Sequence, residues 1–153
     1  MACCDIALYQ PDIAGNTGTI LRTAACLGFC VHLIEPAGFD ISDRNLKRAG
    51  MDYLELAALR RHIDWAGFDD WRRGEGRRAI LFTTRAQLPY TDVSYAASDI
   101  LLFGRESAGV PDGVHETADV RVAIPMAGGG RSLNLAVSVA MAAGEAMRQL
   151  RAG

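Results

Sequence analysis

The sequence predicts one α/β domain with a mainly parallel sheet flanked by helices, and two observations carry this prediction. Apolar runs at 79–84 and 100–103 are bounded by polar residues or glycine, which is typical of strands covered on both faces of a parallel sheet. Segments with helical spacing of apolar residues alternate with such runs. Because 153 residues fit one hydrophobic core, we expect a single domain over 1–153.

The elements of the first half follow from local signals. A short apolar strand is predicted at 5–9, and a helix at 16–27 because Ile20, Ala24 and Leu27 recur at helical spacing. The next strand, 30–34, ends at the Glu35-Pro36 break. Two polar helices are expected at 43–49 and 63–73, the second ending at Gly74.

The second half alternates strands with polar, glycine-containing segments. Strands are predicted at 79–84, 100–103 and 120–124, the last stopping at Pro125. A long helix is predicted at 132–150, since this window lacks proline and is apolar around nearly its whole circumference.

Composition narrows the class of protein. No basic leader precedes an apolar stretch, and no apolar run approaches the roughly 20 residues that span a bilayer, so the cytoplasm and no membrane are expected. The four cysteines lack the paired spacing of a zinc site; we expect buried, reduced thiols and no metal. A net charge of −2 gives no overall basic footprint for nucleic acid, although Arg44, Lys47 and Arg48 share one face of the predicted polar helix.

Three polar segments follow predicted strands: 10–19, 104–112 and 125–134. Because ligands gather at the carboxyl ends of parallel strands, we expect these segments to meet at one site. None of them is a Walker loop, a GxGxxG fingerprint or a GxSxG elbow, so the chemistry is expected to use positioned polar groups and a reactive cofactor.

Single residues in these segments allow two interpretations each. Asn16 either caps a helix or has a functional role, and Ser132 or Asn134 can likewise be a cap. Glu106 is either a site carboxylate or an exposed residue of a tight turn. Arg22, just beyond the first segment, projects away from the apolar stripe of its helix. It is either an ordinary surface arginine or a functional residue whose guanidinium holds a phosphate or a ribose edge.

Taken together, the three segments resemble the three motifs of the SPOUT methyltransferases that methylate ribose 2′-hydroxyls. The first motif corresponds to 16–22, the second to 103–111, and the third to 124–126 with 131–135. Further stretches at 34–39, 48–53 and 145–150 resemble the minimal bacterial enzymes that act on the wobble position of tRNA. Relatives often have proline and arginine where this chain has Arg105 and Ala108.

The resemblance implies a C-terminal trefoil knot, a homodimer, S-adenosylmethionine as cofactor with S-adenosylhomocysteine as product, and the tRNA anticodon stem-loop as substrate. It implies cofactor binding by Phe82, Thr83, Gly104, Ile124, Met126, Ser132 and Leu133. It implies catalytic roles for Arg22, Asn16, Glu106, Ser132 and Asn134. The expected reaction is 2′-O-methylation of a wobble cytidine or modified uridine. The alternatives are the same reaction on another RNA such as rRNA, and a non-catalytic module that binds RNA or a nucleotide.

Overall fold

The computed structural model describes residues 4–40, 42, 44, 58–128 and 132–152. Its centre is a six-stranded sheet in the order β3-β2-β1-β5-β4-β6, and all five pairings between neighbouring strands are parallel. The strands are β1 (Asp5–Tyr9), β2 (Val31–Ile34), β3 (Leu59–His62), β4 (Ala79–Phe82), β5 (Ile100–Phe103) and β6 (Val120–Val122).

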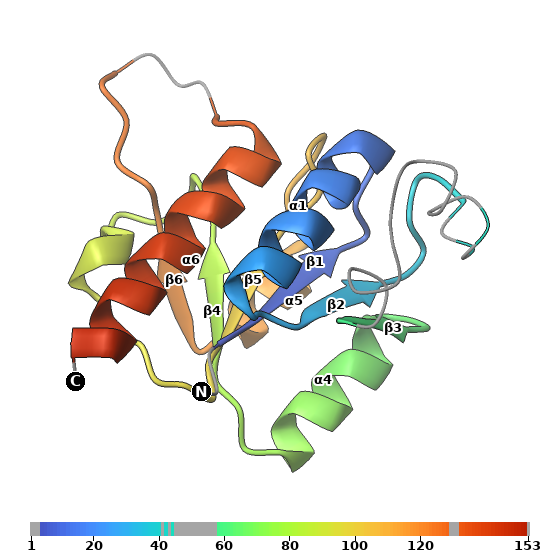
Figure 1. Cartoon of the computed structure of the whole chain (residues 1–153), viewed down its shortest axis with the longest axis horizontal. Coiled ribbons are helices and arrows are strands. Elements are labelled where there is room, and N and C mark those ends of the chain that lie inside the picture. The colour runs from blue at the N-terminus through green and yellow to red at the C-terminus, as the bar shows by residue number, and fades with distance from the viewer. Residues whose placement is uncertain (1–3, 41, 43, 45–57, 129–131, 153) are drawn as a thin grey trace.

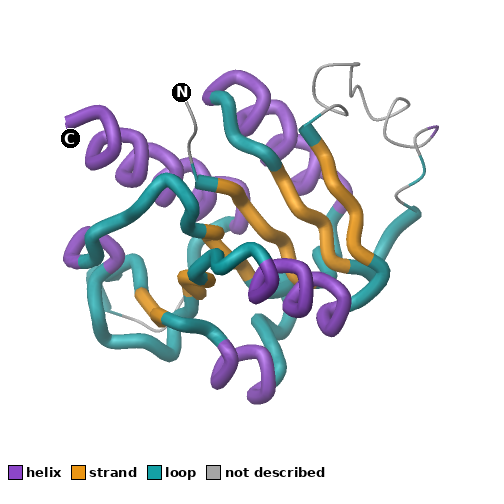
Figure 2. Tube along the Cα trace, turned by 90° about the horizontal axis from the view of Figure 1, so that it is seen from below, coloured by secondary structure: helices purple, strands orange, loops and turns teal. Residues whose placement is uncertain are grey.

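Helices cover both faces of this sheet (Figures 1 and 2). The helices α1 (Ala14–Leu27) and α6 (Leu135–Ala152) pack side by side on one face. The opposite face carries α4 (Trp65–Gly74) and the short α5 (Asp112–Thr117). A 3-10 turn, η1 (Tyr90–Asp92), lies between β4 and β5.

Alternation of side chains along each strand divides the core in two. Ile6 and Leu8 of β1 point towards α1 and α6, whereas Ala7 and Tyr9 point towards α4 and α5. The strands β4 and β5 are apolar and buried at every position because both of their faces are covered. The predicted class, α/β with a parallel sheet, is therefore confirmed.

The predicted strands and the main helices are confirmed with shifted ends. The last helix begins at Leu135 rather than residue 132, and its outer face leaves Val137 and Met141 exposed. β3 and α5 were not predicted. The polar helix expected at 43–49, with Lys47 and Arg48 of its basic face, lies outside the described residues apart from Arg44.

The expectation that the cysteines are buried was partly wrong. Cys4 is fully buried at the start of β1, but Cys26 and Cys30 are exposed on either side of the turn from α1 to β2. The helix α1 is capped at its end by Gly28, whose φ of 83° lies in the left-handed region that glycine adopts readily.

The segment after β4 is tied to the segment after β6. Thr83 donates its backbone N–H to Val122 O at 2.9 Å, and Ala123 exchanges backbone hydrogen bonds with Leu88 and Tyr90. These bonds extend the β4–β6 pairing beyond the strand ends and hold the two segments together at one edge of the sheet. None of the described helices is both long enough and apolar enough to span a bilayer.

Candidate active site

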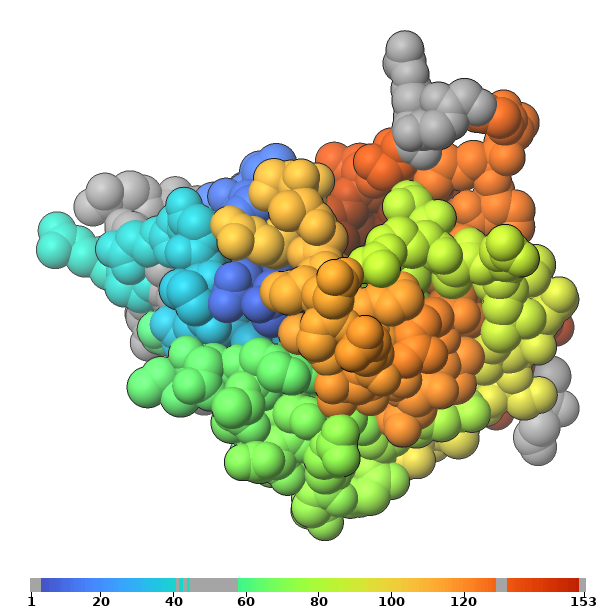
Figure 3. All heavy atoms as spheres, turned by 180° about the vertical axis from the view of Figure 1, so that it is seen from behind, coloured from blue at the N-terminus to red at the C-terminus, as the bar shows by residue number. Residues whose placement is uncertain are grey.

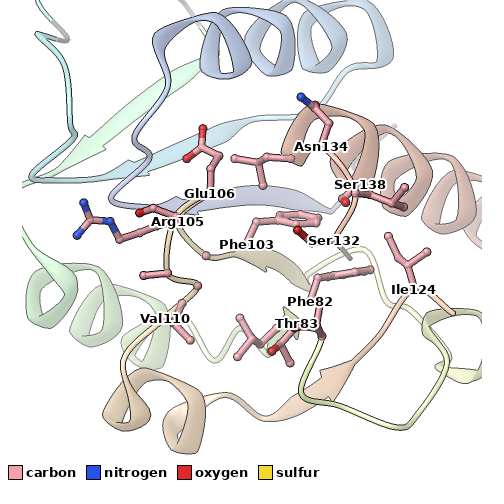
Figure 4. A pocket seen from close by; sticks show the side chains of 18 of the residues that line it. Phe82, Thr83, Phe103, Arg105, Glu106, Val110, Ile124, Ser132, Asn134 and Ser138 are labelled. Carbon is pink, nitrogen blue, oxygen red and sulfur yellow. The ribbon is translucent and has the colours of Figure 1, made fainter. Parts of the chain in front are cut away.

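A cavity of about 540 Å³ opens at the carboxyl ends of β4 and β5 (Figure 4). It is lined by residues 82–85 at the end of β4 and by residues 103–110 at the end of β5. From the third segment and its flanks, Ile124, Met126 and residues 132–135 line it. The start of α1 closes the cavity with Ile13 and Asn16. In the space-filling view, the chain around residues 104–112 lies near that around 83–88 and the start of α6 (Figure 3). The three polar segments thus meet at one site, as expected.

Two stacked phenylalanines form the inner wall of the cavity. The rings of Phe82 and Phe103 lie 4.8 Å apart between centroids and are inclined by only 19°. Both side chains are almost completely buried because they also contact the core beneath α6. Ile124 and Leu133 add apolar surface from the third segment. The result is a rigid apolar wall of the kind that receives a planar ring.

Gly104 is required by the path of the main chain. A Cβ atom at this position would lie 2.6 Å from the carbonyl carbon of Gly109 and 2.7 Å from its Cα. The loop closes there through two backbone hydrogen bonds between Arg105 and Gly109, at 2.9 and 3.0 Å. Gly109 itself has a φ of 66°, a conformation that favours glycine. The glycines thus allow one part of the loop to approach another, in addition to any ligand.

Glu106 connects the second segment to the start of α1. Its carboxylate accepts hydrogen bonds from the backbone N–H groups of Asp12 (2.8 Å) and Ile13 (3.2 Å) and from the side chain of Asn16 (3.2 Å). A carboxylate at this point satisfies N–H groups near a helix start and is stabilised by the helix dipole. Glu106 does lie in a tight turn, closed by Arg105 and Gly109, but its carboxylate is hydrogen-bonded and its side chain is half-buried rather than exposed.

Asn16 and Asn134 continue this connection to α6. Asn16 accepts a hydrogen bond from the Asn134 side chain at 3.1 Å while donating to Glu106. The carbonyl oxygen of Asn134 in turn accepts from the N–H groups of Ala136 (2.8 Å) and Val137 (3.3 Å). Asn134 is thus the cap of α6. Asn16 is not a cap, because α1 begins two residues earlier at Ala14, and its amide instead bridges two loops.

The remaining sequence predictions can be located on this geometry. All seven residues predicted for cofactor binding line the cavity: Phe82, Thr83, Gly104, Ile124, Met126, Ser132 and Leu133. Four of the five predicted catalytic residues also line it: Asn16, Glu106, Ser132 and Asn134. Arg22 is exposed on α1 and is not among the residues that line the cavity of its own chain.

Sequence reasoning missed Asp12. Its carboxylate accepts two hydrogen bonds from the Arg105 guanidinium, at 2.7 and 3.1 Å, and two from the backbone and hydroxyl of Ser107. Hydrogen bonds from Ser107 and then Arg105 lower the pKa of Asp12 to about 2. An aspartate two residues before a helix start is an ordinary turn residue by sequence, and partners more than 90 positions away leave no local signal.

The chain matches the SpoU rRNA Methylase family over residues 4–144. It belongs to that family. A relative from Beijerinckia indica, named tRNA (cytidine(34)-2′-O)-methyltransferase, is 56% identical over 147 residues, which cover 96% of this chain and 92% of the relative.

Two solved structures share the fold. One, described as "Structural insights into the 2-OH methylation of C/U34 on tRNA", has a TM-score of 0.90 and 43% identity, covering 99% of both chains. Another, an AdoMet-bound rRNA methyltransferase from Sinorhizobium meliloti, has a TM-score of 0.85 and 29% identity. It covers 97% of this chain and 57% of the other.

Proposed function

We propose that this protein transfers a methyl group from S-adenosylmethionine to the ribose 2′-hydroxyl of the wobble nucleotide, a cytidine or modified uridine, in the tRNA anticodon. The observation that carries the proposal is the convergence of all three motif segments on one cavity in a member of the SpoU family. The names of the Beijerinckia relative and of the C/U34 structure support the choice of substrate. A tRNA substrate makes the cytoplasm the proposed location.

The cavity fits a cofactor of this size and chemistry. Its volume of about 540 Å³ falls within the roughly 300–1,000 Å³ of small-molecule sites. Phe82 and Phe103 offer an apolar wall to an adenine ring, while Gly104 and the chain at 124–126 and 132–133 offer backbone polar groups. When bound, S-adenosylmethionine supplies an electrophilic methyl group on a sulfonium.

The residues of the protein then have to align the 2′-oxygen and assist the loss of its proton. A guanidinium stays protonated at neutral pH and therefore makes a poor general base. In our proposal, Arg22 binds the phosphate beside the target ribose and stabilises the developing negative charge on its 2′-oxygen. Asn16, Glu106, Ser132 and Asn134 orient the ribose and the cofactor.

The exposed position of Arg22 leads us to propose a homodimer in which this residue acts at the cavity of the partner subunit. The outer face of α6 supports this, because Val137 is 48% exposed and Met141 is 38% exposed beside the small Ala140 and Gly144. Large apolar side chains that share one exposed helix face favour an interface.

We also propose that the chain through β4, β5, β6 and α6 forms the trefoil knot. The bonds between Leu88, Tyr90 and Ala123 are compatible with such threading.

The test is methyl transfer from radiolabelled S-adenosylmethionine to unmodified tRNA, with the product mapped by nucleotide. We expect label on the 2′-oxygen of the wobble nucleotide, lost in Arg22→Ala. Arg73→Ala is the control, because Arg73 is also an exposed helical arginine but lies on α4, on the opposite face of the sheet. The same assay is run with rRNA, and label on rRNA instead of tRNA would favour the alternative substrate. If no RNA is labelled and a calorimetric titration shows no binding of S-adenosylmethionine, the enzymatic proposal is overturned.

A further inference from the structure

Asp12 forms hydrogen bonds with residues 105–107 through both its backbone and its side chain. The backbone N–H of Asp12 donates to the Glu106 carboxylate at 2.8 Å. The carboxylate of Asp12 accepts from the two residues that flank Glu106, namely Arg105 and Ser107. Three consecutive residues of the second segment are therefore each bonded to the same residue of the first.

These bonds are of the strong kind. The Asp12 carboxylate is ionised, only 19% of its side chain is exposed, and one of its partners is a guanidinium held through both Nε and Nη2. Hydrogen bonds with an ionised partner are roughly twice as strong as neutral ones. In Figure 4 the Arg105 side chain points away from the phenylalanine wall, so its charge is directed to Asp12 rather than into the cavity.

The loop that Asp12 holds has little freedom to adjust by itself. It is closed by the Arg105–Gly109 backbone pair, and Gly104 lies against Gly109 with no room for a methyl group. A movement of residues 105–107 is therefore transmitted to Gly104 and Gly109, which line the cavity. Asp12 itself is not among the lining residues.

We infer that Asp12 is a positioning residue that holds the loop after β5 in the shape required to bind the cofactor. The inference rests on the proposed function for the identity of that cofactor. Asp12 acts through Arg105 and Ser107. Its hydrogen bonds to these two residues also keep Glu106 within hydrogen-bonding distance of Asn16. Loss of its carboxylate is expected to weaken cofactor binding in a protein that still folds.

The experiment measures the dissociation constant of S-adenosylmethionine by calorimetry on the full chain, together with the melting temperature. Asp12→Asn keeps the size of the side chain but turns an amide N–H₂ group towards Arg105 or Ser107. We expect it to raise the dissociation constant about tenfold. Ser107→Ala removes one bond and should have a smaller effect, and Arg105→Ala combined with Asp12→Asn should be no worse than Asp12→Asn alone.

Asp69→Asn is the matched control. Asp69 on α4 also bonds arginine guanidinium groups, its side chain is 15% exposed, and it lies on the opposite face of the sheet. It is expected to lower the melting temperature while leaving the dissociation constant within about twofold of wild type.

Two results separate the inference from the proposed function. If wild type binds the cofactor and Asp12→Asn binds it equally well, or if Asp69→Asn weakens binding as much, Asp12 has no positioning role. If wild type itself does not bind S-adenosylmethionine, the proposed function fails and takes this inference with it.

Discussion

The single hydrogen atom that serves as the side chain of Gly104 decides whether the loop after β5 can close. The nearest backbone atom of Gly109 lies 2.6 Å from the position of a Cβ, and backbone cannot rotate away as a side chain can. The loop therefore depends on this glycine for a steric reason that no neighbouring residue can replace.

We predict that Gly104→Ala destabilises the protein by about 1–3 kcal/mol, the usual cost of forcing an extra methyl group into a packed site. Cofactor affinity should fall with it, because the strain is relieved by moving a wall of the cavity. Urea unfolding and calorimetric titration measure the two effects. Gly113→Ala is the control: a Cβ there meets nothing within 4 Å, so both quantities should remain near wild type. Equal behaviour of the two variants would contradict the steric argument.

Asp12 gives a second residue-scale prediction, on acid stability. Its pKa is about 2 in the folded protein against 3.8 ordinarily. Since the folded pKa is the lower one, the ionised carboxylate stabilises the fold fully above pH 3.8, and this contribution is lost as the pH falls towards 2. The gap in urea midpoint between wild type and Asp12→Asn should be constant near neutrality and shrink below pH 3.8. A gap that does not depend on pH would rule out this linkage.

The place of this site in the fold was predictable from the sequence, but the contacts of its individual residues were not. Strand ends and glycine-containing segments were sufficient to predict that 10–19, 104–112 and 125–134 meet, because parallel strands present their carboxyl ends at one edge. The capping hypothesis for Asn16 was wrong, since the true start of α1 at Ala14 has no side-chain cap. The hydrogen bonds of Asn16 and Asp12 join them to side chains 90 or more positions away, and such long-range contacts leave no local pattern in the sequence.

At the scale of the elements, the start of α6 is held by one residue, Asn134, that makes two kinds of hydrogen bond. Asn134 caps this helix with its carbonyl oxygen and holds Asn16 with its amide group. Because the two tasks use different atoms of the same side chain, substitutions can separate them.

We predict that Asn134→Asp keeps the cap, since aspartate is as good a capping residue, but loses the N–H that Asn16 accepts. Its melting temperature should stay near that of wild type while methyl transfer falls. Asn134→Ala loses both tasks and should cost about 1 kcal/mol of stability as well. Thermal unfolding and methyl-transfer rates of the pair test this. An Asn134→Asp variant as active as wild type would remove the bond to Asn16 from the catalytic arrangement.

Two elements, β3 and α5, were missed from the sequence, each for its own physical reason. β3 has the sequence Leu-Arg-Arg-His and lies at the end of the strand order among the described residues, and its Arg60 and Arg61 are exposed. A polar run of four residues has no apolar period from which a strand can be predicted. α5 has six residues, too few for a helical period. β4 and β5 were predictable because burial on both faces makes them uniformly apolar.

At the scale of the whole molecule, the proposed dimer makes its own prediction. Val137→Glu puts a charge on the exposed apolar face of α6, and desolvating that charge opposes association. We expect this variant to sediment as a monomer and to lose methyl transfer. Ile63→Glu is the control, because Ile63 is 84% exposed but lies between β3 and α4, away from α6. If wild type sediments as a monomer, Arg22 has to reach the cavity of its own chain.

The position of α6 also has a consequence for biosynthesis. Val139, Ala142, Ala143 and Ala146 of this helix complete the core on one face of the sheet, including the surface presented by Ile6 and Leu8 near the other end of the chain. A ribosome must therefore translate beyond residue 146 before that face can be covered. Until then the nascent polypeptide exposes apolar strands, the kind of surface that chaperones recognise and that aggregates when release is delayed.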